Sequence, residues 1–220
     1  MKILITAGGT REYIDGVRYI GNCSSGKTGA DLADYLAQCN HQVTWLGAKS
    51  AIKPELQVEQ IYYETFDELA LSLQSVLAQQ GFDLVFQAAA VSDFKVTAVE
   101  LDGQLFEAGR GMKLPTANEV KLVLGKQPKL VSSLKNWSKN SEIEVVAFKL
   151  TNCSDEQNRL TAVRKLIDQE NIDWVAHNDL QEICSQRHAF KLFKNLNQSY
   201  SCENIQQVAD CVIKQLEGKA

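Results

Sequence analysis

The chain has 220 residues, and its hydrophobic content of 45% and charged content of 23% are ordinary for a soluble globular protein. Its formal net charge of −4 argues against a nucleic-acid partner, which would usually need a basic surface. No apolar run approaches the ~20 residues of a membrane span, and the first residues lead straight into a predicted strand without an export signal. We therefore expect a cytoplasmic protein without membrane contact. Six scattered cysteines and three histidines, none in a paired spacing, predict no metal site.

Apolar runs of strand length alternate with stretches of helical period along most of the chain. The expected strands are Lys2–Thr6, Gln42–Gly47, Asp83–Ala90, Glu144–Leu150 and Asp173–Ala176, and the expected helices are Gly29–Gln38, Phe66–Gln79, Pro128–Trp137 and Asp155–Gln169. Strands separated by helices indicate βαβ units. We predict one α/β domain over residues 1–220, a Rossmann-like, doubly wound, mostly parallel sheet with helices on both faces. His188–Phe193 and Gln198–Cys202 predict a C-terminal β-hairpin, followed by a helix from Glu203 to Leu216.

The stretch Lys95–Asn118 interrupts this alternation. It contains Asp102-Gly103, Gly109, Gly111 and Pro115, and it shows little periodicity. A long irregular segment inside a compact domain is often a lid or a binding loop. We predict a flap insertion over residues 95–118, with a plain surface insertion as the alternative.

A glycine turn, Thr6-Ala7-Gly8-Gly9-Thr10-Arg11, directly follows the first predicted strand. Ligands of parallel sheets bind beyond the carboxyl ends of the strands. Paired glycines let backbone N–H groups approach a phosphate, and a threonine adds a hydroxyl. Gly8, Gly9 and Thr10 are therefore candidates for phosphate contact, although a tight turn without a ligand has the same pattern. The dinucleotide fingerprint GxGxxG is absent, which disfavours a nicotinamide enzyme.

Residues 21–28 read Gly-Asn-Cys-Ser-Ser-Gly-Lys-Thr, which satisfies the P-loop pattern GxxxxGK[ST]. A true P-loop lies between the first strand of its domain and a helix, whereas the clear strand here is upstream at Lys2–Thr6. A P-loop kinase or NTPase using Lys27 and Thr28 stays open as an alternative function. A second alternative is a non-catalytic nucleotide-sensing module on the same scaffold, because fold alone does not settle function.

The sequence Ala88-Ala89-Ala90-Val91-Ser92-Asp93-Phe94 closes the most apolar central strand. Small alanine side chains leave room for a bulky group against the strand end, and Asp93 could accept hydrogen bonds from a ribose or a base. The plainer interpretation of Asp93 is a turn or capping residue. Lys113, inside the flap, is by itself most simply a solvated surface lysine.

Taken together and in order, these segments resemble phosphopantothenoylcysteine synthetases along nearly the whole chain. The segments that carry the resemblance are Ile5–Glu12 with Ile14-Asp15, Val17–Lys27, Ala88–Phe94, Pro128–Leu130, Phe148–Leu150 and Asn178–Leu180. The resemblance implies a phosphopantothenate–cysteine ligase, here without the flavin-dependent decarboxylase half that is fused upstream in many bacterial versions. The chain departs from the family pattern at Gly21, Cys23, Gln169 and His177.

The resemblance also implies roles for individual residues. Asn22 would hold an acyl-nucleotide intermediate, Lys113 would stabilise charge on the α-phosphate, and Arg18 would bind the phosphate of the substrate. The residues implied to form the nucleotide pocket are Ala88, Ala89, Ala90, Asp93 and Phe148, with Gly8, Gly9 and Lys165 near the phosphates. The implied co-substrate is CTP or ATP with Mg²⁺, with no flavin. Family members are dimers in which the flap helps to close a site, so we expect a homodimer.

Overall fold

The computed structural model describes residues 1–169, 171–184 and 188–218. Its centre is an eight-stranded sheet in the order β13-β12-β11-β10-β6-β1-β4-β5. The six strands β11, β10, β6, β1, β4 and β5 are parallel to one another. Strands β12 and β13 extend the sheet beyond β11 with antiparallel pairing. The bounds are β1 Lys2–Ala7, β4 Gln42–Ala48, β5 Glu59–Tyr63, β6 Leu84–Gln87, β10 Glu144–Thr151, β11 Trp174–Asp179, β12 Phe190–Asn195 and β13 Gln198–Cys202.

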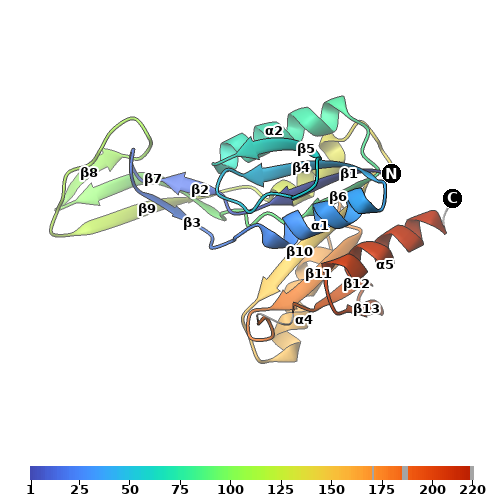
Figure 1. Cartoon of the computed structure of the whole chain (residues 1–220). Helices are drawn as coiled ribbons and strands as arrows, with labels where there is room; N and C mark the ends of the chain where they lie inside the picture. The colour runs from blue at the N-terminus through green and yellow to red at the C-terminus, as the bar shows by residue number, and fades with distance from the viewer. Residues whose placement is uncertain (170, 185–187, 219–220) are drawn as a thin grey trace.

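Helices cover both faces of this sheet, which confirms the predicted doubly wound α/β fold. Helices α1 (Lys27–Gln38) and α5 (Ile205–Glu217) pack side by side on one face, and α2 (Phe66–Gln79) covers the other (Figure 1). Helix α4 (Glu156–Ile167) packs on β10 and β11. Local capping fixes the helix starts: Thr65 accepts a hydrogen bond from the N–H of Glu68 at 3.2 Å, and Asn204 accepts one from that of Gln207 at 3.0 Å. The predicted C-terminal hairpin and final helix are also confirmed.

The expectation of an irregular flap over residues 95–118 is wrong for its first half. Strands β7 (Phe94–Leu101), β8 (Gln104–Glu107) and β9 (Val120–Lys126) form an antiparallel three-stranded sheet, here called the arm. The physical reason is the Asp102-Gly103 turn, whose φ angles of 45° and 85° are those of a two-residue hairpin turn. Only the segment between β8 and β9, which contains Lys113, lacks regular structure.

The arm projects from the edge of the molecule at which the parallel strands end, far from both termini (Figure 1). It has its own small core of Val96, Val99, Leu101 and Leu114. A two-stranded ribbon, β2 (Arg11–Tyr13) and β3 (Tyr19–Gly21), packs against this core through Ile20 of β3 and through Ile14, which directly follows β2. The arm and the ribbon therefore form one packed unit beside the main sheet.

Four further elements differ from the sequence-based prediction. The predicted helix Pro128–Trp137 is a 3₁₀ turn at Leu130–Ser133 followed by a short helix α3, Leu134–Trp137, while Lys129 is extended with φ −86° and ψ 107°. Strand β5 and the ribbon strands β2 and β3 were not expected. Over the described ranges, none of the helices has the length and apolar character needed to cross a bilayer.

Candidate active site

The glycine turn after β1 packs closely against neighbouring parts of the chain. Gly8 has a φ of 87°, and a Cβ there would lie 2.6 Å from the Cβ of Ala48. A Cβ on Gly9 would lie 2.4 Å from the carbonyl oxygen of Asn22. Since only glycine fits either position, Gly9 allows the backbone of Asn22 to lie against the carboxyl end of β1. Phosphate contact by these glycines stays a prediction.

Two threonines tie the end of β1 to the alanine segment that follows β6. The Oγ1 of Thr10 accepts a hydrogen bond from the N–H of Ser92 at 3.0 Å, and Thr10 is only 1% exposed. The N–H of Thr10 donates to the carbonyl oxygen of Ala90 at 3.2 Å. The Oγ1 of Thr6 accepts from the N–H of Ala89 at 3.0 Å. The hydroxyl of Thr10 therefore contributes to the scaffold that holds the alanine segment beside Asn22.

This scaffold borders a cavity of about 560 Å³ at the carboxyl ends of β6 and β10. Its volume is within the usual range of small-ligand sites, ~300–1,000 Å³. It lies beside the point where the strand order reverses, between β1 and β6, which is where doubly wound sheets bind ligands. The described residues around it are Gly21, Asn22, Cys23, Gln87, Ala89, Ala90, Val91, Ser92, Asp93, Pro128, Lys129, Leu130, Val131, Ala147, Phe148, Lys149, Leu150 and Leu166.

Asn22 occupies the junction of this cavity with two smaller hollows of about 240 and 220 Å³. Its Nδ2 donates a hydrogen bond to the carbonyl oxygen of Val91 at 3.2 Å, which orients the side chain. Asn22 is exposed, so the rest of its amide can contact a ligand. The predicted role of Asn22 is consistent with this position.

Charged side chains gather at the mouth of the cavity. The Nζ of Lys129 donates a hydrogen bond to the carboxylate of Asp93, and Lys149 also borders the cavity. Sequence analysis did not select either lysine. Lys129 was assigned to a helix, whereas it is extended, and the signal for Lys149 was its place at the end of an apolar parallel strand.

The predicted site residues divide into three groups. Those around the cavity are Asn22, Ala89, Ala90, Asp93 and Phe148. Gly9 and Thr10 border the adjoining 220 Å³ hollow together with Asn22. Those that border none of these spaces are Gly8, Ala88, Arg18, Lys113 and Lys165. Lys165 lies exposed on α4, where its neighbour Leu166 faces the cavity.

Arg18 contacts the backbone of the residue that follows Lys113 instead. The Nη2 of Arg18 donates to the carbonyl oxygen of Leu114 at 2.9 Å, and the side chain of Arg18 is 42% exposed. Lys113 is exposed on the segment between β8 and β9. Within one chain, the two cations that the resemblance places on the substrates thus belong to two segments that contact each other outside the cavity.

The P-loop alternative gains no support from the geometry. The strand before residues 21–28 is β3, which belongs to the two-stranded ribbon and not to the main sheet. The Nζ of Lys27 binds Asp31 of the same helix at 2.8 Å on the protein surface. A P-loop lysine must reach the β- and γ-phosphates in front of the helix.

Comparison with known proteins identifies the family. The model of the DNA/pantothenate metabolism flavoprotein C-terminal domain matches residues 1–219. The chain belongs to this family.

Relatives of this family domain are parts of longer proteins. A coenzyme A biosynthesis bifunctional protein CoaBC from Thermococcus kodakarensis is 33% identical over 187 residues, which cover 85% of this chain and 43% of that protein. The CoaBC protein of Escherichia coli K12 is 29% identical over 198 residues, covering 88% of this chain and 45% of the relative. The chain therefore spans less than half the length of these two relatives.

Solved structures share the fold of this family domain. The DNA/pantothenate metabolism flavoprotein from Streptococcus pneumoniae has a TM-score of 0.86 and 25% identity, with 100% of both chains covered. A Cab2 variant in complex with phosphopantothenate-cysteine has a TM-score of 0.76 and 19% identity, covering 99% of this chain and 86% of that one.

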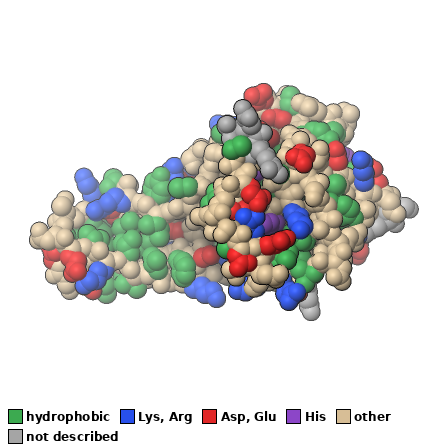
Figure 2. All heavy atoms as spheres, turned by 90° about the horizontal axis from the view of Figure 1, so that it is seen from below, with side chains coloured by type: hydrophobic (Ala, Val, Ile, Leu, Met, Phe, Trp, Pro, Cys, Tyr) green, Lys and Arg blue, Asp and Glu red, His purple; other side chains and the backbone are tan. Residues whose placement is uncertain are grey.

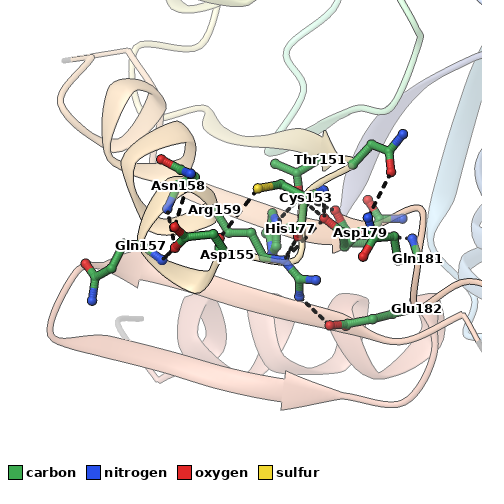
Figure 3. A network of polar contacts seen from close by, with 12 residues as sticks. Thr151, Cys153, Asp155, Gln157, Asn158, Arg159, His177, Asp179, Gln181 and Glu182 are labelled. Carbon is green, nitrogen blue, oxygen red and sulfur yellow. Dashed lines mark hydrogen bonds and ion pairs between the residues drawn. The ribbon is translucent and has the colours of Figure 1, made fainter.

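A second cavity of about 560 Å³ lies between α4 and the β12–β13 hairpin. Figure 3 shows its polar network, in which Thr151 donates to the Oδ2 of Asp179 at 2.5 Å and contacts the Nε2 of His177 at 2.9 Å. Although burial raises the pKa of Asp179, hydrogen bonds from Thr151, Gln181 and Cys153 and the charge of Arg159 lower it to about 2. Burial lowers the pKa of His177. The buried carboxylate is thus fully partnered, as a structural network requires.

Proposed function

We propose that this chain is a phosphopantothenate–cysteine ligase of coenzyme A biosynthesis. It would join L-cysteine to (R)-4′-phosphopantothenate through an acyl-nucleotide and release a nucleoside monophosphate and pyrophosphate. The observation that carries the proposal is the convergence of Asn22, the alanine segment and Asp93 on one cavity of mononucleotide size. Family membership and the phosphopantothenate-cysteine complex of the Cab2 neighbour support it.

The proposed reaction has two steps and needs no side-chain nucleophile. A carboxylate oxygen of phosphopantothenate attacks the α-phosphorus of the triphosphate, and the bond to the β-phosphate breaks to release pyrophosphate. The amine of cysteine then attacks the activated carbonyl, the acyl–phosphate bond breaks, and the amine loses a proton. Catalysis would rest on positioning and on charge stabilisation, each worth several kcal/mol in favourable cases.

The residues around the cavity suit these steps. Asn22, oriented by Val91, would hold the acyl-nucleotide at the junction of the three hollows. Phe148, Ala147 and Leu166 offer apolar surfaces for a base and a ribose, while Lys129 and Lys149 would face the phosphates. The nucleotide would be CTP or ATP.

The described part of the chain contains no cluster of three or more acidic, histidine or cysteine side chains that could hold a metal ion. Asp93 is the one carboxylate among the described residues around the cavity. Mg²⁺ commonly binds one or two carboxylates together with substrate phosphates, so this donor set fits an ion that enters with the triphosphate. The bound ion would neutralise phosphate charge.

We also propose that the active form is a homodimer built through the arm. Figure 2 shows hydrophobic side chains gathered on the arm. The exposed ones are Phe94, Leu105, Met112, Val120, Val123 and Leu124. Surface clusters of this kind mark interaction sites. We propose that a second copy of this chain binds the arm. Lys113 lies outside the cavity of its own chain, so a dimer would allow Lys113 of one protomer to reach the cavity of the other.

The decisive assay uses purified protein with phosphopantothenate, cysteine, Mg²⁺ and either CTP or ATP, and follows pyrophosphate. The ligase releases pyrophosphate with at least one triphosphate and forms the amide product. A nucleotide-sensing module binds nucleotide without releasing pyrophosphate, and that result would exclude the ligase.

Three variants test the proposed roles in the same assay. Lys113→Ala should abolish most pyrophosphate release while the circular dichroism spectrum is unchanged. Lys27→Ala is the matched control: it removes another exposed lysine, and it should leave turnover intact unless the site is a P-loop. Asn22→Asp should let the acyl-nucleotide accumulate on mass spectra, and normal turnover by this variant would refute the role of Asn22.

A further inference from the structure

The carboxylate of Asp15 is the most heavily hydrogen-bonded acid in the ribbon. Asp15 lies in the loop between β2 and β3 and is 0% exposed. Its Oδ1 accepts hydrogen bonds from the backbone N–H groups of Val17 at 2.9 Å and Arg18 at 2.8 Å. Its Oδ2 accepts from the Nε and Nη2 of Arg18 and from the N–H of Leu114 at 3.1 Å. These hydrogen bonds, with that of Arg18 the strongest influence, hold the pKa of Asp15 far below its ordinary value.

The same carboxylate thereby fixes two parts of the chain that are almost 100 positions apart. On one side it holds the guanidinium of Arg18 by two nitrogens, Nε and Nη2, at 2.9 and 2.5 Å. The Nη2 also donates to the carbonyl oxygen of Leu114, and the side chain of Arg18 is still 42% exposed. Because the hydrogen of Nε and both hydrogens of Nη2 are engaged, the two hydrogens of Nη1 point in a set direction, from which they can donate to a phosphate.

On the other side, Asp15 holds the residue that follows Lys113. Leu114 is bound through its N–H to Asp15 and through its carbonyl oxygen to Arg18, and its side chain is 4% exposed in the core of the arm. The residue before Lys113 is held too, since the carbonyl oxygen of Met112 accepts from the N–H of Gly16 at 2.7 Å. The backbone on both sides of Lys113 is thus fastened to the Asp15 loop.

We propose that Asp15 is a positioning residue that sets Arg18 and Lys113 as one unit, so that the cation for the substrate phosphate and the cation for the α-phosphate keep a fixed separation. This inference rests on the proposed ligase function. It adds a specific cause: the ionised carboxylate of Asp15 acts on catalysis through Arg18 and through Leu114, without touching a substrate. A fixed pair of cations would stabilise charge without reorganising during the reaction.

The test is a double-mutant cycle with steady-state kinetics of pyrophosphate release. Asp15→Asn should raise the KM for phosphopantothenate by about tenfold or more and lower kcat, with the KM for the triphosphate little changed. In an Arg18→Gln background, Asp15→Asn should add little further increase in that KM, because its effect passes through Arg18. Fully additive effects on that KM would overturn the link to Arg18.

The matched control is Asp102→Asn in the turn of the arm. Asp102 also accepts backbone N–H groups, from Asn118 at 3.2 Å and Glu119 at 2.8 Å, but it does not contact Arg18 or Leu114. It should leave the KM for phosphopantothenate unchanged. A purely structural Asp15 would lower the active fraction, so kcat would fall while both KM values stayed as in the wild type, and the proposal would be wrong.

Gly16→Ala tests the second link without altering a charge and covers the case in which Asp15→Asn does not fold. A Cβ on Gly16 would lie 3.2 Å from the carbonyl oxygens of Arg110 and Met112, so the segment that carries Lys113 must move slightly. We expect kcat to fall severalfold with the KM for phosphopantothenate unchanged. An unchanged kcat would overturn the link to Lys113. If the wild type releases no pyrophosphate, the proposed function fails together with this inference, whereas an active wild type with unaffected variants overturns the inference alone.

Discussion

At the scale of single residues, two buried glutamines differ in whether their amides are hydrogen-bonded. Gln87 and Gln127 are each 6% exposed. The Nε2 of Gln127 donates to the carbonyl oxygen of Ser92 at 3.2 Å. In Gln87 both amide atoms are buried without a hydrogen-bond partner. A buried polar group without a partner costs roughly 1–3 kcal/mol, so Gln87 is a destabilising residue of the unliganded protein.

Replacing Gln87 by an apolar side chain of similar shape should therefore stabilise the protein. Gln87→Met should raise the free energy of unfolding by about 1 kcal/mol, because the desolvation cost of the amide disappears. Gln127→Met should lower it by about 1 kcal/mol, since it leaves the carbonyl oxygen of Ser92 unpaired. Urea denaturation of both variants checks the pair. Equal losses in the two variants would mean that the amide of Gln87 is hydrogen-bonded in solution.

The predicted site residues that the structure brings together are those whose neighbours in the chain specify their position. Asn22 and Asp93 belong to continuous motifs at strand ends, and the structure brings both to one cavity. Lys129 was missed because its position depends on a contact with Asp93, 36 residues away. The Asp15–Leu114 hydrogen bond, across 99 residues, was equally invisible to local pattern. Long-range polar contacts are set by the fold and leave no local signal.

At the scale of secondary-structure elements, buried and exposed strands differ in how well sequence predicts them. Strand β6 begins with three apolar residues and all four of its residues are buried, as expected for a central parallel strand, and it was predicted. Strand β9 exposes five of its seven residues, including Val120 and Val123, and its mixed pattern suggested no strand. The arm strands are stabilised by antiparallel pairing and by a small core, so their local hydrophobic pattern is weak.

The exposed apolar residues of β9 lead to a prediction about assembly. Val120 and Val123 are 50% and 46% exposed in the single chain. Because burial of a valine contributes ~1.5 kcal/mol or more, the double variant Val120→Lys with Val123→Lys should weaken dimerisation by at least about a hundredfold. Light scattering should show a monomer at concentrations where the wild type is a dimer, and ligase turnover should fall.

A leucine elsewhere on the surface provides the matched control. Leu71 is 67% exposed and belongs to α2, which packs on the main sheet and is not part of the arm. Leu71→Lys introduces the same charge at an apolar surface position, and it should leave the mass in solution unchanged. If both variants keep the mass of the wild type, and that mass is of a dimer, the arm is not the interface.

At the scale of the whole molecule, all three histidines share one electrostatic property. Burial lowers the pKa of His41, His177 and His188 below the ordinary value of 6.5. His177 is also next to Arg159, whose charge lowers its pKa further. Its Nε2 contacts the hydroxyl of Thr151, which already donates its proton to Asp179, so the neutral ring must itself donate through Nε2–H.

These shifts predict a loss of stability on mild acidification. Below pH ~6.5 the unfolded chain binds protons at histidines that the folded chain still keeps neutral, so the free energy of unfolding falls as the pH decreases. Asp179, with a folded pKa of about 2, loses its contribution only below pH ~4 and does not interfere. Urea denaturation between pH 7.5 and pH 5 should show the decrease.

The variant His177→Gln isolates the share of one histidine. Glutamine can still donate to Thr151 but does not titrate, so this variant should lose less stability between pH 7.5 and pH 5 than the wild type, even if it is less stable at pH 7.5. All other ionisable groups are common to both proteins and cancel in the comparison. Parallel curves for the two proteins would mean that His177 accepts a proton as readily when folded as when unfolded, and that its burial in the Thr151–Asp179 network is lost in solution.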